Sequence, residues 1–269
     1  RLPSGVASTF ISPDGERTFG TYLGAAASLR AEELTLDMFK GYAYLFIEGY
    51  LVQDHEMILH AIELAKEAGL QICLDMASYN IVANDLEFFT LLINKYVDIV
   101  FANEEEAKAF TGKEPEEALR VIAKKCSIAI VKVGASGSYI RKGTEEIKVS
   151  AIPVQKVVDT TGAGDYFASG FLYGLYQGWE VIDCLEFGSA EASMMVRSNN
   201  CSDSLPGPDA VHAFIKEEKE YFNSVLEKLK SEHKQIVADK QEIDLQLGAG
   251  IRTGRRKEDF EKKEERAEE

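Results

Sequence analysis

The segment from residue 159 to residue 165 carries the residue types best suited to chemistry in this chain. It reads Asp-Thr-Thr-Gly-Ala-Gly-Asp, between a β-branched, strand-like run and an apolar pattern at helical spacing. A strand that ends in such a turn presents backbone N–H groups and the positive end of a helix dipole at one spot, which attracts anions. Asp165, at the rim of this spot, could accept the proton of an alcohol that attacks a phosphoryl group. The alternative is a glycine-rich helix cap in which Asp165 only complements the dipole.

This pattern, with an aromatic residue and Gly170 behind it, resembles the C-terminal signature of the pfkB, or ribokinase-like, sugar and nucleoside kinases. The resemblance implies that Asp165 is the catalytic base. It also implies an anion hole for the transferred phosphoryl group, formed by the backbone amides of Gly162, Ala163 and Gly164. In the family, the residues matching Asp159 and Thr161 often help to hold a monovalent cation, for which K⁺ is the candidate here.

Residues 103–106 follow a predicted strand and begin a predicted helix. They match the family's Asn-x-x-Glu motif, so the resemblance places Asn103 and Glu106 near the Mg²⁺ and phosphate groups, with Glu106 acting on Mg²⁺ through water. Helix capping is the alternative, because Asn103 is a good N-cap and Glu106 stands at the third helical position.

Residues 132–137 form a second glycine-containing turn at the end of a strand. Gly134 and Gly137 resemble the family's nucleotide-side Gly-x-x-Gly turn, in which glycines let the backbone approach ATP closely. Lys132 could contact a phosphate or merely cap the strand edge. The expected ATP-binding set is therefore Asn103, Glu106, Lys132, Gly134 and Gly137.

Alternating strand and helix patterns predict the elements that must position these residues. The predicted strands cover residues 44–47, 70–75, 97–102 and 128–133, and an antiparallel pair covers 137–141 and 147–152. Helices are predicted at 56–68, 86–94, 104–111, 116–125 and 181–196. We expect an α/β fold with a mostly parallel sheet flanked by helices, in which ligands bind beyond the C-terminal ends of the strands.

The two ends of the chain differ from this middle part. Residues 6–12 and 17–23 flank Pro13-Asp14-Gly15-Glu16 and predict a β-hairpin, which resembles the family's lid. Residues 21–25 resemble the bacterial adenosine-kinase-like branch. The predicted divisions are a lid at 1–24, an α/β domain at 25–198 that is incomplete at its N-terminus, a linker at 199–211 and a charged helical tail at 212–269.

The tail repeats apolar residues every seven positions: Ile215, Phe222, Leu229, Ile236 and Ile243. The positions that should complete a coiled-coil seam are mostly charged, so a single helix with a narrow apolar stripe is favoured. Residues 252–269 are expected to be a frayed helix or a disordered tail. The tail is either a solvated appendage or an interaction module.

Composition excludes some classes of function. A net charge of −15 argues against nucleic-acid binding through a basic face. No apolar stretch approaches the roughly 20 residues that span a bilayer, and no basic-then-apolar leader marks secretion. The scattered cysteines, without metal-site spacing, favour a reducing cytoplasm: Cys73, Cys126, Cys184 and Cys201.

The expected function is transfer of the ATP γ-phosphoryl group, with Mg²⁺, to a primary hydroxyl of a sugar or ribonucleoside of the adenosine or ribose type. One alternative is a truncated, non-catalytic nucleotide-binding fragment, because family members usually begin well before the hairpin with a Gly-Gly motif that grips the acceptor. Another is an interaction protein that uses the tail. A homodimer through the hairpin edges stays open. A dinucleotide-dependent dehydrogenase is disfavoured, because the third fingerprint glycine and its distant acidic residue are missing.

Overall fold

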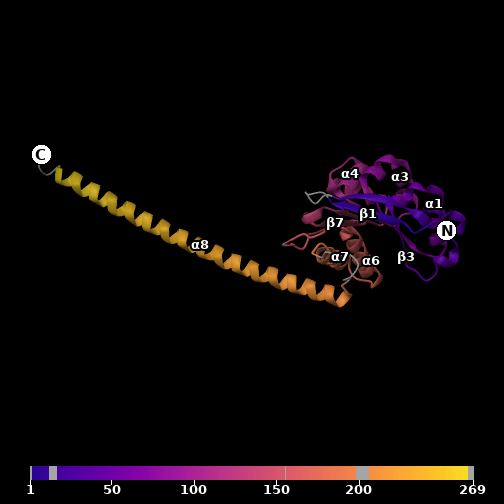
Figure 1. Cartoon of the computed structure of the whole chain (residues 1–269). Helices are drawn as coiled ribbons and strands as arrows, with labels where there is room; N and C mark the ends of the chain where they lie inside the picture. Colours follow the sequence, from indigo (N-terminus) through magenta and orange to yellow (C-terminus); the bar gives the residue numbers. More distant parts are fainter. Residues whose placement is uncertain (1, 12–16, 155, 198–205, 266–269) are drawn as a thin grey trace. The chain divides into compact units, whose positions relative to one another are not determined.

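The computed structural model describes residues 2–11, 17–154, 156–197 and 206–265. It divides into two compact units, Arg1–Leu205 and Pro206–Glu269, which are described separately. The first unit holds a β-hairpin and an α/β body, and the second holds the long helix α8 (Pro208–Glu265) (Figure 1). The finer division into lid, domain, linker and tail stays a prediction.

The body is built on a six-stranded sheet among the described residues, in the order β3-β4-β5-β6-β7-β8. The parallel strands are β3 (Tyr44–Glu48), β4 (Gln71–Asp75), β5 (Ile99–Asn103) and β6 (Ile128–Lys132). The antiparallel strands β7 (Ser138–Lys142) and β8 (Glu145–Val149) complete one edge. The predicted mostly parallel α/β sheet is confirmed.

Helices cover both faces of this sheet, as its doubly buried strands require (Figure 1). One face packs against α1 (His55–Glu67), α2 (Tyr79–Asn84), α3 (Leu86–Lys95), α4 (Glu104–Thr111) and α5 (Pro115–Ile122). The other face packs against α6 (Ala163–Tyr176) and α7 (Val181–Met195). The alternation is visible within β4, where Leu74 belongs to the first core and Cys73 to the second.

Glycines set a close approach between α6 and α7. A Cβ added to Gly188 would lie 2.5 Å from the carbonyl oxygen of Phe167, and one added to Gly170 would lie 2.6 Å from Glu191 Oε2. The first of these contacts is with backbone, which cannot move aside like a side chain. The small residues therefore fix α6, and with it the turn that precedes α6, against α7.

Residues 151–162 differ from the sequence-based expectation. Val154, Val157 and Val158 were expected to lie in a strand that leads into the 159–165 turn, but no described residue between β8 and α6 belongs to a strand. β8 is the last strand of the sheet, and Pro153 has no N–H with which to continue a ladder. The Val158 N–H donates instead to the carbonyl oxygen of Val196, 2.8 Å away at the end of α7. This interaction ties the segment to α7 rather than to the sheet.

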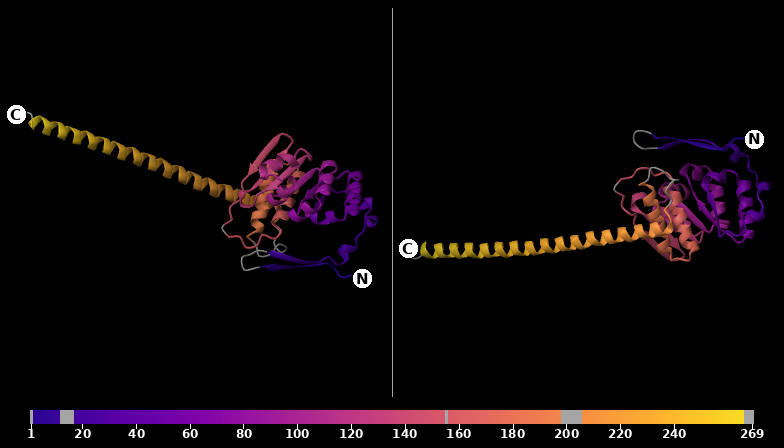
Figure 2. Two further views of the ribbon diagram at one scale, coloured as in Figure 1. Left: turned by 90° about the horizontal axis from the view of Figure 1, so that it is seen from above. Right: turned by 60° about the horizontal axis from the view of Figure 1, so that its bottom comes forward.

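The predicted hairpin is present, with β1 (Val6–Ile11) antiparallel to β2 (Arg17–Tyr22) (Figure 2). Its predicted turn, residues 13–16, lies outside the described residues. Val6 and Tyr22 are directly opposite each other, and both are more than half exposed. Phe10 lies on the same face of the ribbon and is also more than half exposed.

Helix α8 begins a few residues earlier than expected and continues to Glu265, through most of the segment for which fraying or disorder was an expectation. Phe222, Leu229 and Ile236, from the seven-residue repeat, are exposed. Most of the predicted linker lies outside the described residues. None of the helices described combines the length and the apolar character that crossing a membrane demands.

Candidate functional site

The turn before α6 is formed around Gly162, which immediately precedes the helix. Gly162 has φ 78° and ψ −2°, a left-handed conformation that is costly for residues with a Cβ. Thr161 donates its N–H and its hydroxyl to Asp159 Oδ1, at 2.9 and 2.8 Å, which closes the turn from the other side. Gly164 and Asp165 lie in the first turn of α6, where N–H groups have no carbonyl partner within the helix. The local geometry is therefore that of an anion-binding helix start.

Four parallel strands end next to one another beside this turn, and each ends in a polar residue. The registers pair Glu48 with Asp75 and Asn103 with Lys132. A polar row therefore runs along the carboxyl edge of the sheet, in the position where open α/β sheets bind ligands.

Asn103 and Glu106 form a complete capping box. The Glu106 N–H donates to Asn103 Oδ1 at 2.8 Å, while Glu106 Oε2 accepts the Asn103 N–H at 2.8 Å and Oε1 accepts Asn103 Nδ2 at 2.7 Å. The capping alternative from the sequence is thus confirmed. Glu106 is also buried, and burial, followed by the Asp75 carboxylate, raises its pKa to about 7 against the opposing effects of the Asn103 backbone and Lys132.

This arrangement limits how Glu106 can act on a metal ion. Both of its carboxylate oxygens accept hydrogen bonds from Asn103. Across the described ranges, no group of three or more histidine, cysteine, aspartate or glutamate side chains is arranged to hold a metal directly. A carboxylate whose two oxygens already accept hydrogen bonds fits Mg²⁺ that keeps most of its water shell and meets Glu106 through that water.

Lys132 forms an ion pair that the sequence did not reveal. Its Nζ lies 2.9 Å from Asp75 Oδ2, and the two side chains are only 19% and 11% exposed. The same Nζ lies 3.3 Å from where a Cβ on Gly164 would stand. Lys132 is thus held between a carboxylate at the end of β4 and the start of α6, and the proposed phosphate contact stays a prediction.

Asp165 is exposed at this edge and feels the neighbouring charges. Partial burial raises its pKa, and the Asp75 carboxylate raises it further, while Lys132 lowers it. Burial also raises the pKa of Glu48, with Asp165 and then Asp75 adding to the shift. Glu48, Asp75 and Asp165 thus form one negatively charged region. Lys132 is the one lysine among the groups that shift the pKa values of Glu48 and Asp165.

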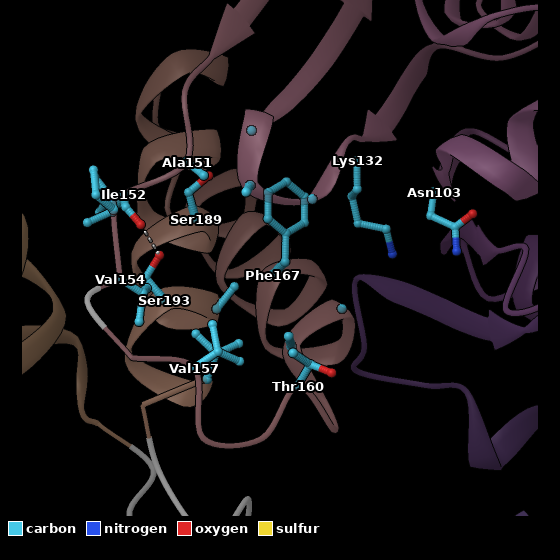
Figure 3. Close-up of a pocket in the computed structure, with 18 of the residues that line it drawn as sticks. Asn103, Lys132, Ala151, Ile152, Val154, Val157, Thr160, Phe167, Ser189 and Ser193 are labelled. Atoms are coloured by element: carbon cyan, nitrogen blue, oxygen red, sulfur yellow. Dashed lines mark hydrogen bonds between the residues drawn. The ribbon is translucent and has the colours of Figure 1, made fainter. Parts of the chain in front are cut away.

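A cavity of about 570 Å³ opens beside the acidic region. Its polar end includes Asn103, Lys132 and Gly164, and its apolar end includes Ile152 and Val154. In Figure 3 Phe167 lies between these two ends, and Ser193 Oγ donates to the carbonyl oxygen of Ile152 at 3.4 Å. The volume is that of a typical small-molecule site.

Only some of the residues predicted for nucleotide binding line the cavity. Asn103, Lys132, Gly134 and Gly137 line it, together with Ala163 and Gly164 of the turn, whereas Glu106 and Asp165 do not line it. Gly137 has φ 99°, and a Cβ there would lie 1.9 Å from the carbonyl oxygen of Val149. Packing against the end of β8 therefore requires Gly137 whether or not a ligand approaches it.

Sequence reasoning missed two parts of the site. It did not identify Asp75 as the partner of Lys132. It also assigned residues 147–152 and the valines at 154, 157 and 158 to strands, although five residues of this stretch line the cavity: Ala151, Ile152, Pro153, Val154 and Val157. Pro153 was the available signal that the ladder would stop.

Comparisons with known proteins agree with this geometry. A model of the pfkB family of carbohydrate kinases matches residues 2–208. The chain is 31% identical over 238 residues to a 5-dehydro-2-deoxygluconokinase from Clostridium perfringens, covering 82% of the chain and 70% of that protein. Similar solved structures include a probable sugar kinase from Rhizobium etli (35% identity, TM-score 0.71) and an adenosine kinase from Sinorhizobium meliloti (30% identity, TM-score 0.71). In both cases the match covers 80% of this chain and 66% of the other, so the chain spans about two thirds of their length.

Proposed function

Because the chain belongs to the pfkB family of carbohydrate kinases, a family of phosphotransferases with an alcohol acceptor, we propose that it transfers the γ-phosphoryl group of ATP to a primary hydroxyl of a sugar or ribonucleoside. One observation carries the proposal. The turn at Gly162–Gly164, at the N-terminus of α6, joins a cavity of about 570 Å³ to an exposed carboxylate, Asp165.

Asp165 is the proposed proton acceptor. As the acceptor oxygen bonds to the γ-phosphorus and the bond to the ADP oxygen breaks, the hydroxyl proton passes to the Asp165 carboxylate. The raised pKa of Asp165 makes it a stronger base than an aspartate with an ordinary pKa. Its exposure leaves room for the incoming hydroxyl.

The α6 turn is the proposed site of charge stabilisation. Its backbone N–H groups, from Gly162, Ala163 and Gly164, would face the oxygens of the phosphoryl group during transfer. The Ala163 N–H donates to the carbonyl oxygen of Thr160 at 3.2 Å and would share or exchange this bond. Such donors are fixed before the reaction begins, and removing one typically costs ~3–4 kcal/mol of transition-state stabilisation.

The cavity is the proposed ATP site. Its apolar end, with Ile152 and Val154, suits a purine ring, and its polar end, with Asn103 and Lys132, faces the α6 turn. ATP bound in this direction would bring its terminal phosphate toward Gly164 and Asp165.

Two metal ions complete the proposal. Mg²⁺ bound with ATP would neutralise phosphate charge, with Glu106 oriented toward its water shell by Asn103. Asp159 and Thr161, which the turn brings together, are the proposed contributors to a monovalent cation site. A higher rate in K⁺ than in an equal concentration of tetramethylammonium would support that site, and equal rates would contradict it.

We propose a neutral acceptor of the adenosine or ribose type. Glu48 and Asp75 raise the negative charge around Asp165, which disfavours an acceptor that is itself an anion. The resemblance of residues 21–25 to the adenosine-kinase-like branch supports the same choice.

The proposed compartment is a reducing cytoplasm. Three cysteines of the described part are unpaired, and burial keeps them as thiols by raising their pKa values: Cys73, Cys126 and Cys184.

The test is product analysis by mass spectrometry with Mg²⁺–ATP and three separate acceptors, namely adenosine, D-ribose and 5-dehydro-2-deoxy-D-gluconate. A phosphorylated adenosine or ribose is the expected result. Phosphorylation of the acidic sugar alone would overturn the acceptor class but keep the reaction. ATP binding in calorimetry without any phosphorylated product would favour the second candidate, a non-catalytic nucleotide-binding protein.

A further inference from the structure

Asp75, the ion-pair partner of Lys132, is the residue of the site to which the proposed reaction assigns no role. Lys132 extends from the end of β6, and Asp75 from the end of β4, so the pair spans the end of β5. The 2.9 Å contact is largely shielded from water. A partly buried pair of this kind contributes little net stability, because desolvation of the two charges offsets their attraction. Stability alone therefore gives no reason for its place.

The surrounding backbone fixes the Asp75 carboxylate before any ligand binds. Asp75 Oδ1 accepts the Ala77 N–H at 3.0 Å, which leaves Oδ2 for Lys132. Ala77 is the one described residue other than glycine with positive φ, at 61°. This left-handed residue turns the chain so that its N–H reaches back to Asp75.

Backbone from β3 supports the same turn. A Cβ on Gly49 would lie 2.4 Å from the carbonyl oxygen of Met76, so the chain after β3 packs directly on the residue next to Asp75. The Met76 N–H donates to the carbonyl oxygen of Phe101 at 3.0 Å. Asp75 is thus held from β3 and β5 at once.

The ammonium of Lys132 lies in a position that is electrostatically unfavourable without a partner. It lies against Gly164, in the first turn of α6, where the helix dipole is positive and repels cations. The Lys132 ammonium and the positive end of the α6 dipole therefore lie close together, and the negative charge of Asp75 offsets their repulsion. An anion placed between the lysine and the helix start would interact favourably with both.

We propose that Asp75 is a positioning residue that holds the Lys132 ammonium over the first turn of α6, so that lysine and helix start together face the phosphoryl group in transfer. This inference rests on the proposed function. Without Asp75, the flexible lysine side chain would move away from the helix dipole, and its contribution to the transition state would be lost.

The test is a double-mutant cycle with Asp75→Asn and Lys132→Met. The asparagine keeps the size of the side chain and an oxygen that can accept the Ala77 N–H. Loss of Lys132 is expected to lower kcat by about 10²-fold, the low end of the effect of removing one group that stabilises transition-state charge. Asp75→Asn should lower kcat by about 10-fold or more, and adding it to Lys132→Met should have less than about a two-fold further effect, because the two residues act as a unit.

The matched control is the ion pair between Lys66 and Asp98. Asp98 also accepts a backbone N–H, from Ile72 at 2.7 Å, and its contact with Lys66 Nζ is 2.6 Å. This pair lies where β4 and β5 begin, at the opposite edge of the sheet from the site. Asp98→Asn should leave kcat unchanged.

A second readout is the pH profile of kcat/KM, since the charged groups that act on Asp165 come from several elements. Asp75 on β4 raises the pKa of Asp165 and Lys132 on β6 lowers it, while Glu48 on β3 and Tyr50 after β3 feel the same carboxylate. Asp75→Asn should move the acid limb to lower pH, and Lys132→Met should move it to higher pH. An acid limb that moves in neither variant would separate the pair from Asp165 and overturn the inference.

Affinities for ATP and ADP, measured by calorimetry, separate failure of this inference from failure of the proposed function. Both variants should reduce the preference for ATP over ADP, and the double variant should reduce it no more than Lys132→Met. Additive losses in kcat or in that preference would overturn the inference, as would wild-type kcat in Asp75→Asn. Coupled losses of ATP preference in a protein that phosphorylates no acceptor would overturn the proposed reaction while the pairing stands.

Discussion

Replacing Asp165 by asparagine separates its two interpretations, as a proton acceptor and as a helix-capping charge. The amide has the shape of the carboxylate but cannot take a proton. Asp165 does not line the cavity, so the proposed nucleotide contacts of Asn103, Lys132 and the glycines should remain. Asp183 provides a matched control, because it is the third residue of α7 just as Asp165 is the third residue of α6, and it is exposed.

The magnitude follows from the role. A positioned general base contributes about 10²–10⁴-fold in rate, which corresponds to roughly 3–5 kcal/mol of transition-state free energy. As a capping charge alone, an acidic residue in the first turn of an exposed helix contributes about 0.3–1 kcal/mol to stability and nothing to catalysis. We therefore expect Asp165→Asn to lower kcat by about 10²–10⁴-fold with unchanged ATP affinity. Asp183→Asn should affect only stability.

The assay is steady-state phosphorylation of the accepted sugar or nucleoside, with ATP affinity from calorimetry and stability from urea unfolding. Turnover by Asp165→Asn within about three-fold of the unmodified protein, with both variants losing the same small amount of stability, would show that Asp165 is only a cap. A parallel loss of ATP affinity and turnover would refute the argument that Asp165 lies outside the nucleotide site.

Three further predictions concern pH, packing and the anion-binding turn. The pKa of Glu106 is raised to about 7 in the folded state, so folding retains a proton that the unfolded chain loses at a lower pH. Without metal or nucleotide, the contribution of Glu106 to the free energy of unfolding should fall as pH rises from about 4.5 to 7. Urea unfolding of Glu106→Gln should lack this pH dependence, and an unchanged pH dependence would show that it comes from other residues. Gly188→Ala should lower the free energy of unfolding by about 1–3 kcal/mol, because its Cβ would meet the Phe167 carbonyl, and a neutral result would show that α6 and α7 can separate. Gly162→Ala should lower the free energy of unfolding by about 1–2 kcal/mol and should also lower kcat, because the left-handed conformation of Gly162 orients the backbone N–H groups of the turn. A loss of stability with unchanged kcat would show that the turn takes no part in phosphoryl transfer.

The sequence predicts most of the fold because its strands are short, apolar and separated by amphipathic helices. The helix at Glu104–Thr111 has the bounds expected from its capping box, which is a local interaction between Asn103 and Glu106. The short helix α2 was missed, since six residues give too little periodicity to recognise. The valines at 154–158 favour a strand by side-chain shape, but strand formation also needs a neighbouring edge, and a local pattern does not report one.

The site was predictable where its parts are contiguous. The turn at 159–165 and the capping box each lie within seven residues. The contact between Asp75 and Lys132 joins residues 57 positions apart and depends on the order of β4, β5 and β6, which the sequence pattern leaves open. The left-handed conformation of Ala77, whose N–H fixes Asp75, could not be predicted because such positions are usually occupied by glycine.

Phosphorus NMR of the protein with Mg²⁺–ATP and the three candidate acceptors tests the central proposal most directly. We predict a new phosphomonoester resonance with one acceptor, appearing at the same rate as ADP and absent with Asp165→Asn. ADP accompanied only by inorganic phosphate, or no consumption of ATP with any acceptor, would contradict phosphoryl transfer to these acceptors.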